Sequence, residues 1–483
     1  MLSLSERGPT AYAELTMPDS APRAPGRLLV TYSWWLGVIL AGYMLFDRAF
    51  AYIHIPGTPL YIGETVLGIG ILGILAATGY VRVVIRDEPI FALLGAFFLW
   101  GLIRFLPGYH TYGMDAVRDF ALCYYCLFAF LIAAALARSP EILERLVSQL
   151  DRFIPWLLIW LPLGLILQQV VKIPPNVPGT PIPLLSHKPG NAAIAALIAL
   201  GSLWLFPARR SARSRATWSI VALFTIALAA TQNRGGLLGA AAGAIVGLAY
   251  YQDRMRLIIR AVVVLALGLS IAAVLSLNVP TTGPAVQGQR EFSASQLFAN
   301  LGSLVGANNS TDLVGTEDGR QQLWSLIYQQ QVADALLIRG SGFGPNLAYQ
   351  VGVFESSTTD PLRSPHNSHL DILARMGLLG LALWVVLWLG WYRRLIRGCR
   401  LLAERGLHFR RQVAVLCMMI TTAFLVSSFF DPQLEGAQVA ALVWTAFGIG
   451  VAVTSFRGSF GRRMSMLAAP GSPSPSVSRS ASV

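Results

Sequence analysis

Charged residues are scarce in this sequence. Asp, Glu, Lys and Arg make up 13% of the 483 residues, whereas 54% are hydrophobic. Soluble proteins rarely contain so little charge, and apolar runs of about 18 residues, long enough to cross a bilayer, recur along the chain. The composition excludes an ordinary soluble domain and predicts an all-α polytopic membrane protein.

Cysteines and common catalytic motifs are also rare. The four cysteines provide no disulfide framework, and the CxxC spacing of Cys123 and Cys126 falls inside an apolar run, where chance explains it better than a redox or metal site does. We find no P-loop, GxSxG or HExxH motif. The first 27 residues are polar, so we expect no cleavable signal peptide and assign targeting to the first apolar segment.

The hydropathy pattern predicts about twelve transmembrane helices and one large periplasmic loop between helices 9 and 10. We expect a disordered cytoplasmic tail at 1–26, helices 1–9 within 27–278, a periplasmic loop with an amphipathic helix and a catalytic motif at 279–369, helices 10–12 within 370–456, and a second disordered tail at 457–483.

Basic residues predict the orientation. The formal charge is +13, and most of the 37 Lys and Arg lie in alternate short loops between the apolar segments. Such loops face the cytoplasm under the positive-inside rule. Both termini are therefore expected in the cytoplasm, and the long loop in the periplasm. The charge is explained by topology, so we expect no nucleic-acid partner.

A histidine motif lies where the long loop meets the tenth apolar segment. Ser364 is predicted to cap a helix that begins at Pro365, which places His366 and Asn367 in its first turn. The positive helix end there disfavours imidazolium, so His366 would stay neutral, as a general base must. The alternative is a structural or exposed histidine, which is the more common role at a membrane boundary.

Other residues near this motif have weaker cases. His369 lies one turn further and either supports His366 or only packs. Gly377 and Gly380 have the spacing that permits close helix packing. Arg375 is either functional or part of a structural contact. The acidic residues of the long loop form no ligand set with the two histidines, so we expect no metal.

Several basic residues fall on the predicted outer side. Arg234 precedes a helix start, where a phosphate can bind, and Arg320 begins the loop helix expected over 320–337. Lys188, before another helix start, and Arg118 are supporting candidates. The alternative for each is a loop, snorkelling or solvated cation.

Three segments resemble the superfamily of O-antigen ligases and Wzy-type polymerases, which are bacterial membrane glycosyltransferases. His366-Asn367 followed by Gly377 and Gly380 is similar to the ligase His-Asn…Gly-x-x-Gly signature. Residues 319–344 look like the family's GR…W…GxGxG loop. Residues 231–236 look like its T-x-S-R-G junction, with Asn233 in place of serine. The resemblance covers about residues 215–450.

The resemblance implies an inverting, metal-independent transfer of a glycan from undecaprenyl-diphosphate to an acceptor hydroxyl at the periplasmic face of the bacterial inner membrane. His366 would be the general base, Arg234 and Arg320 would bind the diphosphate, and no cofactor would be needed. The acceptor would be lipid A core, as in lipopolysaccharide biosynthesis, or a growing polysaccharide; related enzymes modify protein. Two different classes remain open: a polysaccharide transporter or flippase, and a non-catalytic scaffold.

Overall fold

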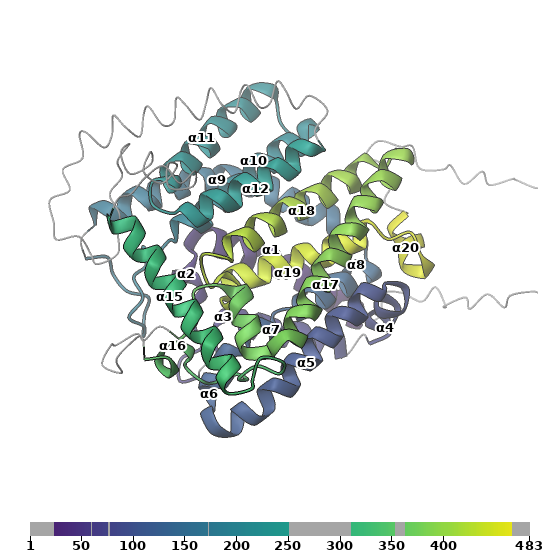
Figure 1. Cartoon of the computed structure of the whole chain (residues 1–483). Helices are drawn as coiled ribbons and strands as arrows, with labels where there is room; N and C mark the ends of the chain where they lie inside the picture. Colours follow the sequence, from purple (N-terminus) through teal and green to yellow (C-terminus); the bar gives the residue numbers. More distant parts are fainter. Residues whose placement is uncertain are drawn as a thin grey trace, which may run out of the picture.

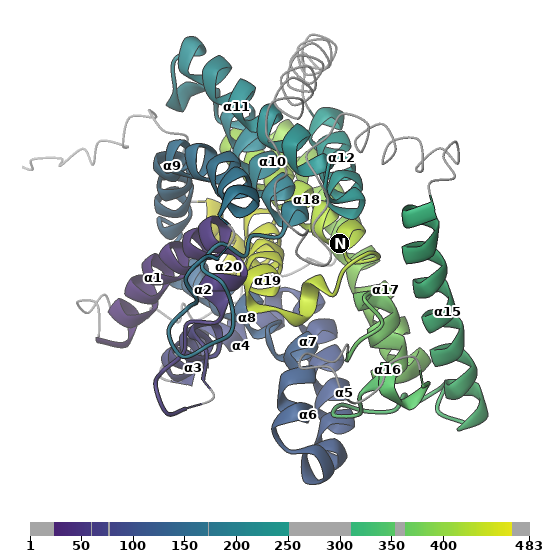
Figure 2. The same cartoon turned by 90° about the vertical axis from the view of Figure 1, so that its left-hand side faces the viewer.

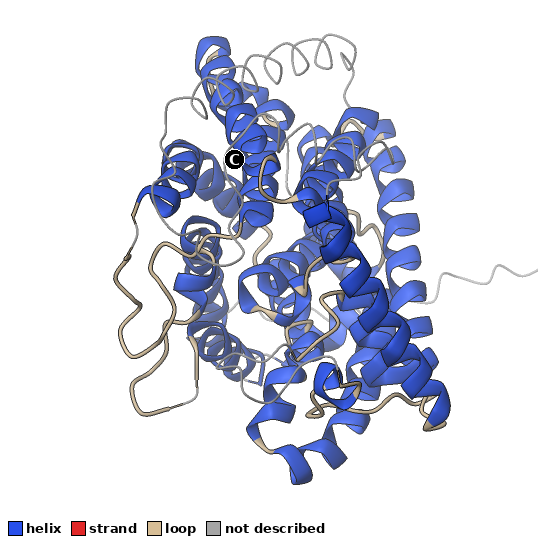
Figure 3. Cartoon of the chain, turned by 60° about the vertical axis from the view of Figure 1, so that its left-hand side comes forward, coloured by secondary structure: helices blue, strands red, loops and turns tan. Residues whose placement is uncertain are grey.

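The computed structural model is a helical bundle in which the two ends of the chain's described part pack together (Figure 1). The structure describes residues 24–58, 60–75, 78–171, 173–250, 311–352 and 363–465. Figure 3 shows only helices and loops in these ranges, where the pairing of extended backbone is limited to two isolated bridges. The expected all-α class is confirmed for the described residues.

The first half of the chain forms α1 (Ala24–Phe46), α2 (Arg48–Ala51), α3 (Ile62–Leu75), α4 (Thr78–Asp87), α5 (Pro89–Tyr112), α6 (Met114–Asp119), α7 (Ala121–Tyr124), α8 (Leu127–Arg138), α9 (Ile142–Val170), α10 (Pro189–Leu205), the short η1 (Pro207–Arg209), α11 (Ala212–Ala230) and α12 (Arg234–Ala249). The second half forms α15 (Thr311–Ala333), α16 (Leu347–Gln350), α17 (Ser368–Glu404), α18 (His408–Ser427), η2 (Gln433–Glu435), α19 (Ala437–Val453) and α20 (Gly458–Ser465).

The number of membrane spans among the described residues is five to eight. Helices α1, α5, α9, α17 and α18 are long and apolar enough to cross a membrane alone. Three bent pairs bring the total to eight if each is one span: α3 with α4, α6–α7 with α8, and α19 with α20. Helices α10 and α12 are apolar but shorter. The expected span at 257–278 and the start of the long loop lie outside the described residues, so the count of twelve stays a prediction.

Helical structure extends further into both predicted tails than the sequence suggested. Helix α1 already begins at Ala24, inside the tail expected at 1–26. Helix α20 forms within the tail expected at 457–483. Its Phe460 and Met464 side chains are buried, and the Asp87 carboxylate accepts a hydrogen bond from the Phe460 N–H. Burial of two apolar side chains and a side-chain cap stabilise this short helix, which periodicity alone did not reveal.

Aromatic side chains form the core between α17, α19 and α5. Trp388 stacks on Trp444 with ring centroids 5.7 Å apart, and Trp391 stacks on Phe447 at the same distance. Each such pair contributes about 0.5–1.5 kcal/mol beyond the area it buries. This core packs the middle of α17, a helix that begins directly after the histidine motif.

Small residues bring α10, α12 and α18 into close contact. A Cβ added at Gly236 of α12 would overlap Gly190 of α10, and one added at Gly239 would overlap the Ala423 carbonyl of α18. Glycines at such crossings let membrane helices approach to backbone contact. The N-terminal ends of α10 and α12 therefore meet.

Helix α15 lies at one edge of the molecule, beside α17 (Figure 2). Its Leu323 and Ile327 are buried in a small cluster with Ala374 of α17 and Leu347 of α16. The loop helix predicted over 320–337 is thus confirmed in its existence, but it runs over 311–333. It ends early because Ala335 takes a positive φ of 53° at the chain reversal.

Candidate functional site

Helix α17 begins later than the sequence predicted. Its first residue is Ser368, and its N-cap is Asn367, whose side-chain oxygen accepts hydrogen bonds from the N–H groups of His369 (3.0 Å) and Leu370 (3.1 Å). The prediction of a Ser364 cap with His366 and Asn367 in the first turn is therefore wrong. Asparagine satisfies two free N–H groups at once, and this decides the start of the helix.

His366 lies just before this cap in a left-handed backbone conformation, with φ of 53°. Such a conformation costs a non-glycine residue on the order of 1–3 kcal/mol and is concentrated at functional sites. The preceding carbonyl, of Pro365, accepts a hydrogen bond of 2.7 Å from the Trp324 indole of α15. The loop helix therefore holds His366 in its strained position.

The His366 imidazole is neutral. Burial lowers its pKa to about 4, and the positive charges of Arg320 and Lys188 act in the same direction, while Asp431 opposes them. Its Nδ1 is buried and has no hydrogen-bond partner within the described residues. The sequence predicted a neutral His366, but from the helix end. In the structure the low pKa results first from burial and then from the charge of Arg320, a residue of α15 that lies more than forty positions earlier in the chain.

Lys188 reaches this site because Asp47 fixes the start of α10. The buried Asp47 carboxylate accepts a 2.7 Å hydrogen bond from the Lys188 N–H and a 2.9 Å bond from the Asn191 amide. Lys188 occupies the N-cap position, one residue before Pro189. The predicted helix start after Lys188 is confirmed, and Asp47 is the contact that positions it.

Arg234 is the first residue of α12 and is half-buried. The preceding Asn233 caps the helix by accepting a hydrogen bond from the Gly236 N–H, and its amide donates to Asp431 at 3.4 Å. Asp431 is the carboxylate that acts on His366. Asn233 thus performs the capping role of the serine it replaces, and Arg234 is linked to His366 through the Asn233–Asp431 contact.

We call His366, Lys188, Arg234, Arg320 and Asp431 the His366 cluster. Four of its members were predicted from the sequence; Asp431 was missed. The available signal was an acidic residue in a short loop, Phe429-Phe430-Asp431-Pro432, between the last two expected spans on the predicted outer side. The predicted periplasmic loop at 279–369 alone contains seven acids, so the position of Asp431 did not single it out.

His369 does not face the His366 cluster. Its Nε2 donates to the Leu425 carbonyl at 2.9 Å, and its Nδ1 accepts from the Trp384 indole at 3.1 Å. These partners belong to α18 and to the aromatic core, and they occupy both ring nitrogens. His369 packs α17 against α18, which is the second of the two roles the sequence left open.

Asn367 and Arg118, the other two supporting candidates, also lie outside the His366 cluster. Asn367 is buried and acts as the cap described above. Arg118 has an exposed side chain on α6, while its neighbours Asp115 and Asp119 bind Arg363 in the loop before His366. The structure therefore brings the acids of α6, rather than Arg118, to the histidine loop.

A second charged group lies next to the cluster, and we call it the Arg375 network. Arg375 is 1% exposed and forms ion pairs of 2.9 Å with both Asp371 and Asp119. The network also includes Arg363, Asp115 and Glu435. Burial and the neighbouring Asp371 raise the pKa of Glu435 well above its usual range, and the Ser364 hydroxyl bonds to it. Arg375 therefore has the structural role that the sequence gave as an alternative, and the network anchors the loop just before His366.

The motif glycine Gly377 breaks α17 rather than packing it against another helix. Its φ of 69° and ψ of −171° are not helical, and an added Cβ would overlap the Ile338 carbonyl. Residues 337–342 enter the break, where the Leu378 N–H binds the Leu337 carbonyl at 2.8 Å and the Ser341 N–H binds the Ala374 carbonyl at 2.8 Å. Backbone groups freed by a break in an apolar helix need such partners. The glycine loop and the histidine helix therefore form one unit.

Among the described residues, no group of three or more His, Cys, Asp or Glu side chains could hold a metal ion. The cations of the His366 cluster fit an anion instead. Lys188 and Arg234 lie at the N-terminal ends of α10 and α12 and suit a phosphate or diphosphate, because helix N-termini add free N–H groups and a positive dipole, while Arg320 of α15 adds positive charge at His366.

Comparison with known proteins identifies the part of the chain that carries this site. Residues 219–385 match the family model of the O-antigen ligase domain. These residues are similar to an O-antigen ligase domain, and we refer to them below as the ligase domain. No curated protein matches the chain significantly. The ligase domain contains Arg234, Arg320 and His366, whereas Lys188 and Asp431 come from outside it. The candidate site thus combines residues of this domain with residues of α10 and of the α18–α19 connection.

Proposed function

We propose that this protein transfers a glycan from undecaprenyl-diphosphate to an acceptor hydroxyl at the periplasmic face of the bacterial inner membrane. The observation that carries the proposal is a neutral, strained His366 placed among cations within an O-antigen ligase domain. A neutral imidazole can accept a proton, and the cations can bind a diphosphate. The active site would face the periplasm, with both termini in the cytoplasm.

The chemistry follows from these roles. His366 takes the proton of the acceptor hydroxyl as its oxygen forms a bond to the anomeric carbon of the donor. The bond from that carbon to the diphosphate oxygen breaks, and undecaprenyl-diphosphate leaves with the bonding electrons. Arg234, Arg320 and Lys188 stabilise the negative charge that develops on it. A single displacement inverts the anomeric centre and requires no metal or cofactor.

Asp431 adds a second function to this mechanism. Its negative charge raises the pKa of His366 against the effect of burial and of Arg320 and Lys188. Without it, the imidazole would be a weaker base. When His366 becomes imidazolium, Asp431 would stabilise the added positive charge, as carboxylates do beside catalytic histidines.

The acceptor separates the two candidates within the family. A ligase would pass the glycan to lipid A core, and a polymerase would lengthen the glycan itself. The ligase domain favours a transferase over the transporter and scaffold alternatives, because neither of these needs a base beside a diphosphate site.

The deciding experiment supplies purified protein in lipid with undecaprenyl-diphosphate-linked glycan and either lipid A core or a second glycan carrier. Transfer to lipid A core identifies a ligase, and chain lengthening identifies a polymerase. The product should have the inverted anomeric configuration. If neither acceptor receives glycan while the donor crosses the bilayer, the transporter is favoured instead.

A further inference from the structure

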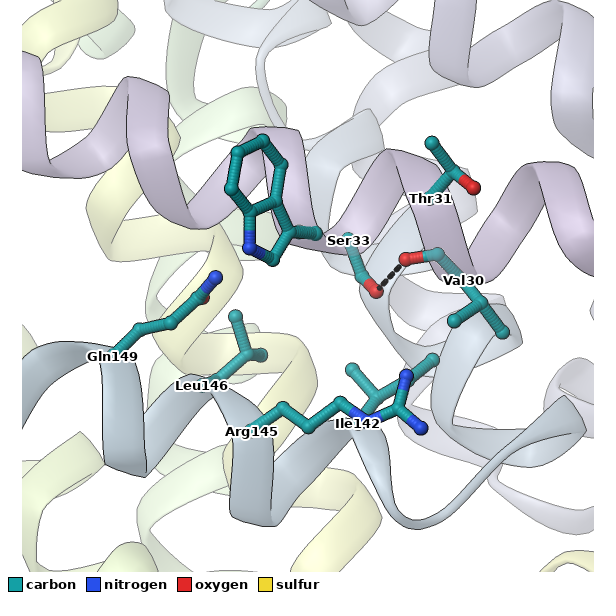
Figure 4. A pocket seen from close by; sticks show the side chains of 8 residues that line it. Val30, Thr31, Ser33, Ile142, Arg145, Leu146 and Gln149 are labelled. Atoms are coloured by element: carbon teal, nitrogen blue, oxygen red, sulfur yellow. Dashed lines mark hydrogen bonds between the residues drawn. The ribbon is translucent and has the colours of Figure 1, made fainter.

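A pocket lies between α1 and α9, away from the His366 cluster. Its volume is about 240 Å³, and its lining residues are Val30, Thr31, Ser33, Trp34, Ile142, Arg145, Leu146 and Gln149 (Figure 4). It lies near the start of α1, whereas Asp47 and Lys188 lie beyond the end of that helix. At 1.5 Å per residue, the separation along α1 is about 20 Å. The pocket therefore cannot belong to the site described above.

The pocket contains one basic side chain, Arg145, that is available to bind an anion. Arg145 is exposed, and its guanidinium extends across the pocket toward Val30 of α1 (Figure 4). Two neighbouring acids of α9 are already used, since Glu144 pairs with Arg209 and Asp151 pairs with Arg210, whereas the exposed N-cap residue Glu141 forms no ion pair among the described residues. Within the described residues, Arg145 forms no ion pair of its own, so the pocket presents a positive charge.

Gln149 adds a second polar group without a partner. Its side-chain oxygen is buried and accepts no hydrogen bond within the described residues. Gly37 of α1 lies directly opposite, and its lack of a side chain is what permits this close approach. In contrast, the Ser33 hydroxyl is satisfied by the Val30 carbonyl at 2.7 Å. The Gln149 oxygen is therefore closed off against α1, and the exposed Arg145 guanidinium is the charged group that the pocket offers to a ligand.

The remaining walls are apolar and open to the membrane. Ile142 and Leu146 line one side, and Trp34, 50% exposed, forms the rim beside the equally exposed Trp35. The apolar window of α1 begins at Leu29, so the pocket lies where that helix enters the membrane. Tryptophan and arginine are both typical of this depth, where rings and cations meet lipid headgroups.

We propose that the α1–α9 pocket binds an anionic phospholipid. Its phosphate pairs with Arg145, and an acyl chain lies along Trp34 and Leu146. Basic pockets between membrane helices on the cytoplasmic side bind anionic headgroups, and the arginine distribution predicts that this end of α9 faces the cytoplasm. The volume is below the roughly 300–1,000 Å³ of sites that enclose a whole ligand, so the acyl chains stay outside.

The test uses the purified full-length protein in detergent, titrated with phosphatidylglycerol and observed by native mass spectrometry. Arg145→Gln should weaken phosphatidylglycerol binding about tenfold, the loss expected for one charge-assisted contact. Arg152→Gln is the matched control, because Arg152 is an exposed arginine on the same helix outside the pocket. It should bind phosphatidylglycerol like the unmodified protein. Neutral phosphatidylcholine should bind weakly to all three proteins.

Three outcomes would overturn the proposal. Unchanged phosphatidylglycerol binding by Arg145→Gln would remove the proposed contact. Equal losses in Arg145→Gln and Arg152→Gln would indicate a general effect of helix charge. Displacement of the lipid by millimolar inorganic phosphate would indicate a small-anion site. Thermal unfolding of each variant shows that it is folded, and the measurement does not depend on glycan transfer.

Discussion

The His366 cluster and the Arg375 network lie side by side, yet they handle charge in opposite ways. In the network, acids outnumber arginines, and Arg375 is enclosed by Asp119 and Asp371 at 2.9 Å. In the cluster, Lys188, Arg234 and Arg320 outnumber the single acid Asp431. A buried, paired group fixes one geometry, whereas an excess of cations near a neutral histidine suits an incoming anion. The comparison teaches that an arginine near the histidine motif is no sign of catalysis until its partners are known.

The largest effect is expected in the Arg375 network. Arg375→Ala leaves Asp119 and Asp371 as unpaired buried carboxylates, which should reduce the free energy of unfolding by about 3–5 kcal/mol. Chemical or thermal unfolding in detergent measures the change. Arg118→Ala, at an exposed position on α6, should stay within about 0.5 kcal/mol. An Arg375→Ala protein as stable as its parent would show that the network does not support the fold.

Next comes the comparison of the two histidines. His366→Ala should lower glycan transfer by about a hundred- to ten-thousandfold, the contribution typical of a general base, with little change in stability. His369→Ala should lower the stability and leave transfer per folded molecule nearly unchanged, because it loses the hydrogen bonds to Leu425 and Trp384. Transfer per folded molecule and unfolding midpoints are compared for both variants. Equal losses of transfer in the two would contradict the assignment of the base.

The cations of the cluster should have intermediate effects. Arg320→Ala and Arg234→Ala should each reduce donor use by about ten- to a hundredfold, since each loses charge-assisted bonds to the diphosphate. Lysine at either position should restore activity only in part, because it lacks the forked donors of arginine. The ratio kcat/KM for the donor is the measurement. Full activity in either alanine variant argues against diphosphate binding at that residue.

A smaller effect is expected in the pH dependence of transfer. The pKa of His366 is about 4, so the base is neutral above that pH and activity should fall only on the acid side of it. Arg320 lowers this pKa and Asp431 raises it. Arg320→Ala should therefore move the acid limb of kcat/KM to higher pH, and Asp431→Asn should move it to lower pH. Shifts of the opposite sign would show that Arg320 and Asp431 do not set the pKa of His366.

No effect is expected from chelation. The proposed mechanism uses His366 as the base and arginines for charge stabilisation, so EDTA should leave the rate of transfer unchanged. The assay is repeated with added Mg²⁺ or Mn²⁺ after chelation. If EDTA abolished activity and a divalent ion restored it, the basic side chains of the cluster would not suffice to stabilise the leaving diphosphate.

The ligase-domain motifs were visible in the sequence because they depend on residue type and short spacing. His366, Arg320 and Arg234 were found in this way, as were the helix starts after Lys188 and Asn233. Periodicity failed where a cap or a break decided the structure. The start of α17 depends on the Asn367 side chain, and Gly377 was expected to serve helix packing although it interrupts the helix.

Hydropathy alone determined that this chain has helices long and apolar enough to cross a membrane, since apolar length is a local property. Only the tertiary structure decided which charges act together. His366 and His369 are three residues apart, yet one faces cations and the other faces α18. Lys188, Arg320 and Asp431 come from elements far apart in the chain, the start of α10, helix α15 and the α18–α19 connection. The electrostatic environment of a side chain depends on the residues that pack around it. Local sequence patterns do not reveal which distant residues those are.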